Sequence, residues 1–208
     1  MNSNSQLRRC LRAPIPEIEG AANLLEQAVM AHFAGKHEEV VYLLHEANMP
    51  AIREWTESLW GKNSAYAPTG PYWSEIPNKA EISSRMPSKS VQQALVVRDG
   101  HYCRFCGIQL VRKEVRVRLN TLYPNAHLWG RSNSEQHSAL QCMWLQYDHI
   151  IPHSRGGSSD ISNMLITCAP CNYGRMQYTL EEAQLENPLL HAPRIGPWRG
   201  LELINSSK

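Results

Sequence analysis

The chain has 208 residues, 42% of them hydrophobic, and a formal net charge of +2. This apolar content is enough for one medium domain or two small ones, and the net charge is too small to indicate a nucleic-acid partner by itself. No apolar run approaches the roughly 20 residues of a membrane span, and residues 1–16 lack the apolar segment of a secretory signal. We therefore expect a cytoplasmic protein with no membrane association, in which thiols stay reduced.

The charges are unevenly distributed along the chain. Residues 13–61 hold eight acidic and two basic side chains, a balance of −6, whereas residues 98–131 hold seven basic and two acidic ones, a balance of +5. Two interpretations stay open: two solvated faces of opposite sign, or a polyanion bound to the second segment.

An N-terminal helical region is predicted for residues 1–62. Pro50 suits the first turn of a helix, where its missing N–H costs nothing, and apolar residues three and four apart predict three helices. These residues are Leu24, Leu25, Ala28 and Val29, then Val40, Val41, Leu44 and Ala47, then Ile52, Trp55 and Leu59.

The rest of the chain divides into three further segments. Residues 63–97 are rich in Gly, Pro and Ser and are predicted to be a linker that ends in a lead-in helix, "SVQQALVVRDG". Residues 98–178 contain two strand-like stretches, "IQLVRKEVRVRL" in an inserted basic hairpin and "ALQCMWLQYDHII". Residues 179–208 are expected to form a helix near Thr179–Leu185 and a Pro-rich tail.

Two Cys-x-x-Cys pairs indicate a metal site. Cys103 and Cys106 form the first pair, and Cys168 and Cys171 form the second. Four thiolates suit tetrahedral Zn²⁺ and leave no position for water, so the zinc is expected to be structural. The alternative is a redox pair, but no βαβ pattern surrounds either motif. The other cysteines, Cys10 and Cys142, are expected to be ordinary small apolar residues.

The order of motifs resembles the HNH endonucleases, a family of ββα-metal nucleases. The matching pieces are "CRFC", "DHIIP", the Gly156–Gly157 pair, Asn163 and "CAPCNYGR". The resemblance covers roughly residues 98–178 and implies an α+β fold: a ββα-metal core, held together by a four-cysteine zinc site and preceded by the small helical region.

The resemblance also implies roles for individual residues. His149 corresponds to the base that activates water, since imidazole titrates near neutral pH. Asp148 and Asn172 would supply oxygen ligands to a catalytic Mg²⁺ or Mn²⁺, and Asn163 would hold the intervening loop and orient the base. Arg175 would contact a phosphate. Many relatives have His where this chain has Asn172, so the motif is a His-Asn-Asn variant.

Three functions are weighed. The first is an endonuclease that hydrolyses DNA and grips backbone phosphates through the basic stretch and the loop. The residues are Arg112, Lys113, Arg116, Arg118 and Arg155, and for each the alternative is a solvated side chain. The second is a non-catalytic zinc-ribbon module that binds nucleic acid. The third concerns the acidic N-terminal helices, which either dock on a protein partner, such as the ATPase or sensor subunit of a phage-defence or restriction system, or complete the core.

Overall fold

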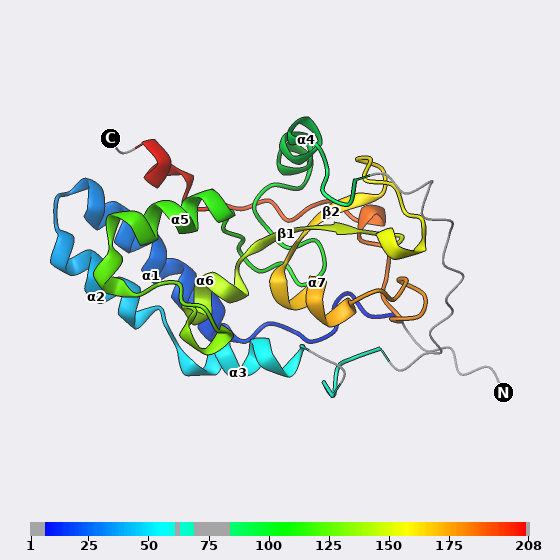
Figure 1. Cartoon of the computed structure of the whole chain (residues 1–208), viewed down its shortest axis with the longest axis horizontal. Helices are drawn as coiled ribbons and strands as arrows, with labels where there is room; N and C mark the ends of the chain where they lie inside the picture. Colours follow the sequence, from blue (N-terminus) through cyan, green and yellow to red (C-terminus); the bar gives the residue numbers. More distant parts are fainter. Residues whose placement is uncertain (1–6, 61–62, 69–83, 207–208) are drawn as a thin grey trace.

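The computed structural model describes residues 7–60, 63–68 and 84–206. Within them the chain forms seven α-helices and one two-stranded antiparallel sheet, which confirms the predicted α+β class. Helices α1, α2, α3, α5 and α6 gather at one end, and the sheet with α7 lies at the other (Figure 1). Much of the predicted linker, residues 69–83, lies outside the described residues. No helix in the described ranges is long and apolar enough to cross a membrane.

The three predicted N-terminal helices are confirmed. They are α1 (Pro16–Phe33), α2 (His37–Glu46) and α3 (Pro50–Ser58). Helices α1 and α3 each begin with proline, whose missing N–H needs no partner at that position. The predicted apolar stripes face inward, with Leu25, Leu44 and Trp55 almost fully buried.

The lead-in helix is also confirmed, as α4 (Lys89–Asp99). The Ser88 side chain caps it by accepting a hydrogen bond from the Val91 backbone N–H. At its other end, the buried Asp99 carboxylate accepts from the Ile166 N–H and from two N–H groups of Arg98. These bonds fix the end of α4 against the sheet.

The predicted basic hairpin is wrong, because its central part is the helix α5 (Lys113–Leu122). In the predicted strand, Val115 and Val117 would share one face. Val115 and Leu119, four residues apart, are buried instead, and Val117 is 50% exposed. Burial at this spacing is that of a helix.

The ββα order implied by the family resemblance is present. After the short helix α6 (Ser138–Cys142), β1 (Leu145–His149) pairs with β2 (Met164–Cys168), and α7 (Ala169–Arg175) follows directly. The register pairs Leu145 with Cys168 and His149 with Met164. The strand predicted in "ALQCMWLQYDHII" is therefore correct only in its second half.

The helix predicted near Thr179–Leu185 is wrong, since this segment forms turns. The backbone there bonds to the N-terminal segment: the Arg8 N–H donates to the Gln184 carbonyl, and the Glu186 N–H donates to the Arg8 carbonyl. Only the 3₁₀ turns η5 (Pro188–Leu190) and η6 (Glu202–Ser206) follow among the described residues.

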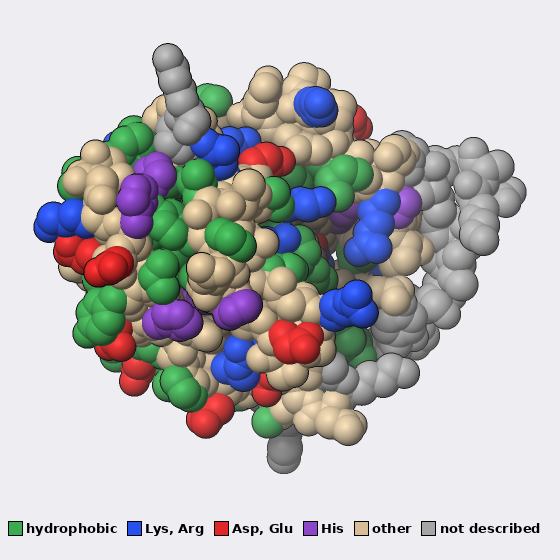
Figure 2. All heavy atoms as spheres, turned by 60° about the vertical axis from the view of Figure 1, so that its left-hand side comes forward, with side chains coloured by type: hydrophobic (Ala, Val, Ile, Leu, Met, Phe, Trp, Pro, Cys, Tyr) green, Lys and Arg blue, Asp and Glu red, His purple; other side chains and the backbone are tan. Residues whose placement is uncertain are grey.

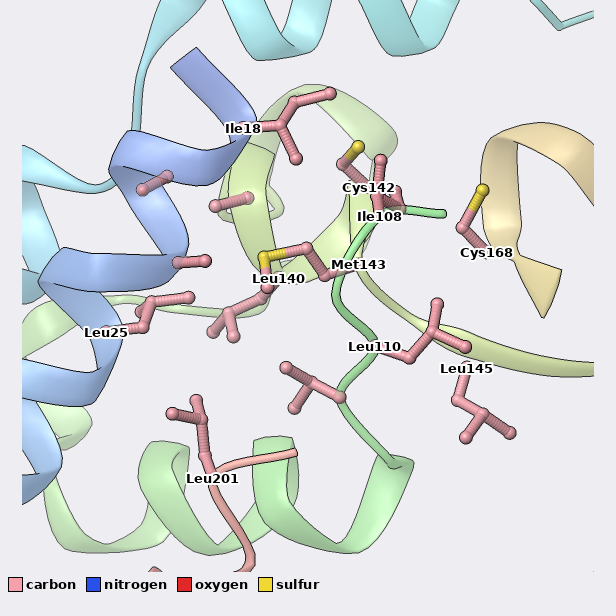
Figure 3. Packing of buried hydrophobic residues seen from close by; sticks show 14 of the residues in the cluster. Ile18, Leu25, Ile108, Leu110, Leu140, Cys142, Met143, Leu145, Cys168 and Leu201 are labelled. Atoms are coloured by element: carbon pink, nitrogen blue, oxygen red, sulfur yellow. The ribbon is translucent and has the colours of Figure 1, made fainter. Parts of the chain in front are cut away.

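One continuous hydrophobic core joins the two ends of the molecule. Figure 3 shows Ile18 and Leu25 of α1 close to Leu140 and Met143, with Leu110, Leu145 and Cys168 beyond them. Leu201, from the C-terminal tail, contributes to the same cluster. The N-terminal helices therefore share a core with the strands and the cysteine pairs.

Candidate active site and metal centre

The four predicted cysteines come together in one group. The Sγ atoms of Cys103, Cys106, Cys168 and Cys171 all lie within 4.8 Å of one another, and the Sγ atoms of Cys106 and Cys168 are 3.6 Å apart. Tetrahedral zinc with Zn–S bonds of about 2.3 Å places its sulfur ligands about 3.8 Å apart. The spacing therefore fits a metal ion held by four sulfurs.

Short turns aim these sulfurs at one point. The Gly107 N–H donates to the Cys103 carbonyl in the first pair, and in the second the Cys171 N–H lies 3.4 Å from the Cys168 sulfur. Cys168 ends β2 and precedes α7, so a bound ion would tie the first turn to the junction of strand and helix. Because protein sulfurs supply all four ligands, no open coordination position is left for catalysis.

A polar pocket lies where β1 ends beside α7. It has a volume of about 200 Å³, and Asp148, His149, Asn172 and Arg175 all line it. Arg85 and His153 also line this pocket. On the face drawn in Figure 2, Lys and Arg side chains gather with histidines around a hollow. We name the pocket lined by Asp148, His149, Asn172 and Arg175 the β1–α7 pocket.

His149 is buried and held from one side. Its Nε2 lies 3.0 Å from the Ser159 hydroxyl, and its ring lies 5.4 Å from that of His153, centroid to centroid. Burial, together with the positive surroundings of His153, Arg85 and Arg175, lowers the pKa of His149 to about 4. The imidazole is therefore neutral at neutral pH.

The bonds of Ser159 indicate which imidazole nitrogen carries the proton. The Ser159 Oγ lies 2.7 Å from the Ser84 carbonyl and 3.2 Å from the Arg85 carbonyl. Its single hydrogen is needed for these acceptors, so His149 Nε2 must donate to the hydroxyl. Nδ1 is then the unprotonated nitrogen, with a lone pair available to accept a proton.

Asp148 and Arg175 form a buried ion pair. Arg175 Nη2 lies 2.5 Å from Asp148 Oδ1, and Nε lies 3.3 Å from Oδ2. Burial raises the pKa of Asp148, while the Arg175 charge and hydrogen bond oppose this shift. The guanidinium also donates to the backbone carbonyls of His149, Ile150 and Tyr178.

The predicted contact between Arg175 and a phosphate does not fit this geometry. Its side chain is 1% exposed, and the five acceptors around it match the five N–H groups of a guanidinium. Its contacts instead hold Asp148 and the chain after β1 in place.

Asn172 and Asn163 occupy different surroundings. Asn172 lies on α7, is half-buried and lines the β1–α7 pocket. Asn163 is part of the loop: its Oδ1 accepts from the Ile151 N–H, and its Nδ2 donates to the carbonyls of Ile151 and Ser158. These are the bonds that a loop-holding residue needs, and none of them goes to His149.

Gly157 is required for this close packing. A Cβ atom at Gly157 would lie 1.9 Å from the Ile151 carbonyl oxygen and 2.8 Å from Asn163 Nδ2. Because the Ile151 oxygen is backbone, it cannot move aside as a flexible side chain would. The second glycine of the pair therefore lets the loop fold back on itself.

The predicted phosphate-gripping side chains do not form one basic surface. Arg112 is paired with Glu202 and Arg155 with Glu182. Arg116 is 6% exposed and stacks between the rings of Trp129 and Trp144, its Cζ 3.4 Å and 4.4 Å from their centroids. Burial lowers the pKa of Arg116 to about 10. Of the other two, Arg118 is half-buried and Lys113 is exposed.

The sequence interpretation missed several pocket residues. Arg85 is exposed and lines the pocket from the segment before α4, and Ser159 holds His149 from within the loop. His153, by contrast, lies in the motif segment itself, in the loop after β1. No local pattern marks Arg85 or Ser159, since each depends on how distant segments meet.

An antiparallel pair of strands, a helix that follows directly, and a histidine at the end of the first strand define the ββα-metal nuclease class. Residues 141–187 match the family model described as HNH endonuclease. The ββα order and the four-cysteine group agree with this match, which indicates a nuclease. No curated protein and no solved structure gives a significant match to the chain.

Proposed function

We propose that the protein is a metal-dependent endonuclease that hydrolyses phosphodiester bonds of DNA. The observation that carries the proposal is the β1–α7 pocket, where a neutral His149 lies beside the oxygen-bearing side chains of Asp148 and Asn172. Phosphodiester hydrolysis needs a base for water and positive charge for the phosphate oxygens, and this set supplies the base and two candidate metal ligands.

His149 acts as the general base in this proposal. Its Nδ1 takes a proton from the attacking water while Ser159 holds the ring through Nε2. The carbonyls of Ser84 and Arg85 fix the hydroxyl in turn. Holding the imidazole at one nitrogen preserves both its tautomer and its direction. The leaving group is the 3′ oxygen, so the expected products carry 5′-phosphate and 3′-hydroxyl ends.

Asp148 and Asn172 would hold the catalytic ion. A carboxylate and an amide oxygen suit Mg²⁺ or Mn²⁺ rather than a softer metal. Arg175 and the His149 backbone N–H use three of the roughly four acceptor sites of the Asp148 carboxylate, so one remains for an ion, and Asn172 makes no side-chain hydrogen bond within the described residues. The donor set therefore fits a hard cation. When bound, the ion would supply positive charge to the phosphate and to the leaving oxygen.

Arg85 takes the phosphate-binding role that was predicted for Arg175. It is exposed, lines the same pocket and lies close enough to His149 to lower its pKa. A guanidinium in this position can donate two parallel hydrogen bonds to a phosphate. Replacing Arg85 with Lys should keep more activity than replacing it with Ala, since the charge remains but the two-pronged contact is lost.

The cysteine group is proposed to hold one structural Zn²⁺. Its position, between the turn at residues 103–106 and the start of α7, would fix Asn172 relative to β1. This ion is separate from the catalytic one because all its ligands are sulfur.

Plasmid cleavage tests the proposal. Purified protein is incubated with supercoiled DNA and Mg²⁺, Mn²⁺ or EDTA, and DNA binding is measured in parallel. We expect cleavage with either metal and none in EDTA. Binding without cleavage under every metal would contradict the nuclease.

DNA binding without cleavage would favour the second candidate function, a zinc-ribbon module that binds nucleic acid without cutting it. The observation in its favour is the Asp148–Arg175 pair, since a carboxylate already neutralised by arginine has less need of a cation. A base held at one nitrogen, with two oxygen ligands beside it, argues for the enzyme.

We also propose a role as the effector of a phage-defence or restriction system, docked on an ATPase or sensor subunit through the acidic N-terminal helices. The shared core supports the alternative, that these helices complete the fold. Deleting residues 1–60 should then give insoluble protein, and a soluble, active remainder would favour docking.

A further inference from the structure

A second pocket lies on another side of α7 and differs in chemistry from the first. It has a volume of about 340 Å³ and is lined by three aromatic rings and three amide side chains: Trp60, Trp144, Tyr173, Asn133, Gln136 and Gln141. None of these six residues carries a charge, so the pocket is not built for a phosphate. We name it the aromatic–amide pocket.

The rings are held in place by close packing. Tyr173 and Trp60 meet edge to face, with ring centroids 5.6 Å apart. Beside them, Gly174 lets the backbone after α3 approach α7, because a Cβ there would lie 2.8 Å from the Leu59 carbonyl oxygen. Trp144 is stacked against the buried Arg116. A flat ligand would therefore meet rings that are already ordered, which lowers the entropy cost of binding.

The amides are oriented as well. Gln141 Nε2 donates to Asn133 Oδ1 at 3.2 Å and to Gln136 Oε1 at 3.0 Å. Arg53 fixes the same rim by donating to the backbone carbonyls of Asn133 and Gln136. The side-chain oxygens of Asn133 and Gln136 each accept one bond from Gln141, and their NH₂ groups can be offered to a ligand.

Two polar atoms of this pocket lack partners. Gln141, 1% exposed, has a buried Oε1 with no hydrogen-bond partner among the described residues, and the same holds for Trp60 Nε1. A buried polar atom without a partner costs free energy and calls for an explanation. Since neither atom is accessible to solvent in this structure, a ligand would bond them only after the Gln141 and Trp60 side chains shift.

From these features we propose that the aromatic–amide pocket binds one unstacked DNA base next to the cleavage position. A nucleobase has a flat face for stacking on aromatic rings and an edge of donors and acceptors for amides. The location fits: Tyr173 directly follows Asn172, and neighbouring side chains of a helix point about 100° apart, so one short helix serves both pockets. This inference rests on the proposed function and adds that the substrate presents an unpaired or extruded base.

The test uses the full chain with His149→Ala, which binds without cutting. Its affinity is measured by fluorescence anisotropy for a single-stranded DNA oligonucleotide and for an abasic strand of the same length. Tyr173→Ala is added as the test variant, since Tyr173 is 40% exposed and its loss should leave the fold intact. Tyr173→Phe keeps the ring, and Tyr42→Ala removes an exposed tyrosine of α2 as a matched control.

We expect Tyr173→Ala to weaken binding of the base-containing strand by roughly 5- to 150-fold, the range for one stacked base. Binding of the abasic strand should not change, and Tyr173→Phe and Tyr42→Ala should resemble the parent. If Tyr173→Ala affects both strands equally, or neither, the base-binding pocket is overturned.

Failure of this proposal is distinguishable from failure of the nuclease. Base-dependent binding through Tyr173 in a protein that never cleaves would keep the pocket and remove the enzyme. Cleavage by the parent protein without base-dependent binding would keep the nuclease and overturn the base-binding pocket. No binding to either strand would overturn the pocket.

Discussion

Arg175 and Asp148 form a two-point ion pair beneath the β1–α7 pocket, with both side chains almost fully buried. The pair joins the end of β1 to the last residue of α7, and three backbone carbonyls complete the coordination of the guanidinium. The same carboxylate is the proposed metal ligand, so the stability of the fold and the position of the ion depend on one contact.

Arg175→Met should therefore be strongly destabilising. It leaves the Asp148 carboxylate buried without its partner, which costs about 3–5 kcal/mol in comparable pairs. The matched control is Arg9→Met, which breaks an exposed ion pair: Arg9 Nε lies 3.5 Å from Glu186 Oε2. Exposed ion pairs contribute about 0–1 kcal/mol to the free energy of unfolding. Urea unfolding of both variants checks the difference. An equal loss of unfolding free energy in the two variants would mean that the buried pair stabilises the fold no more than the exposed one.

The pH dependence of cleavage follows from the lowered pKa of His149. Its folded-state pKa, about 4, lies below the ordinary histidine value near 6.5, so the neutral base persists as pH falls and activity is lost only as pH approaches 4. We expect the acid limb of the kcat/KM profile to lie below 6.5. An acid limb at or above 6.5 would contradict the environment described for His149.

Arg85→Gln should move that acid limb to higher pH, since it removes a positive charge that disfavours the imidazolium. Lys89→Gln is the control, because it removes an exposed charge that does not line this pocket. The position of the limb, rather than the rate itself, is the quantity to compare.

Cys171→Ser should abolish metal binding at the cysteine group. We expect one zinc per chain by elemental analysis in the parent and none in the variant. Metal binding contributes to folding, and each kcal/mol lost lowers the Tm of a chain of this size by about 2–4 °C, so the Tm should fall clearly. Cys10→Ser should keep the zinc, and loss of metal there instead would put Cys10 among the ligands.

Gly157→Ala should reduce cleavage by distorting the loop that carries Ser159. The added Cβ would overlap the Ile151 carbonyl, and the Asn163 bonds to Ile151 would be lost with it. Gly20→Ala is the control: nothing lies within 4 Å of a Cβ there, and alanine within a helix is favoured over glycine by roughly 0.5–1 kcal/mol. Full activity in Gly157→Ala would show that the loop does not position the base.

The sequence predicted best what depends on local spacing. The three N-terminal helices followed from apolar residues three and four apart, and the cysteine group from two Cys-x-x-Cys pairs. The ordered motif around His149 also picked out Asp148, His149, Asn172 and Arg175, which line one pocket although they lie on a strand and a helix separated by a loop.

Features that depend on tertiary contacts were missed. Val117 alternates with Val115 as in a strand, but only packing decided that Val115 and Leu119 are the buried pair. The segment Thr179–Leu185 forms turns rather than the expected helix, and the backbone at its end is hydrogen-bonded to Arg8. Arg116 was assigned to a phosphate as part of a basic stretch and Arg175 from the family resemblance, yet Arg116 is packed between two tryptophans and Arg175 is paired with Asp148.

The most direct test of the account is single-turnover cleavage of DNA with saturating Mg²⁺ by the parent protein and by His149→Ala, with DNA affinity and Tm measured on the same samples. We expect His149→Ala to lose at least about 100-fold in rate, the lower range for a general base, while its affinity and Tm stay near those of the parent. Cleavage at the parent's rate by His149→Ala would remove His149 from the chemistry and contradict the proposed active site.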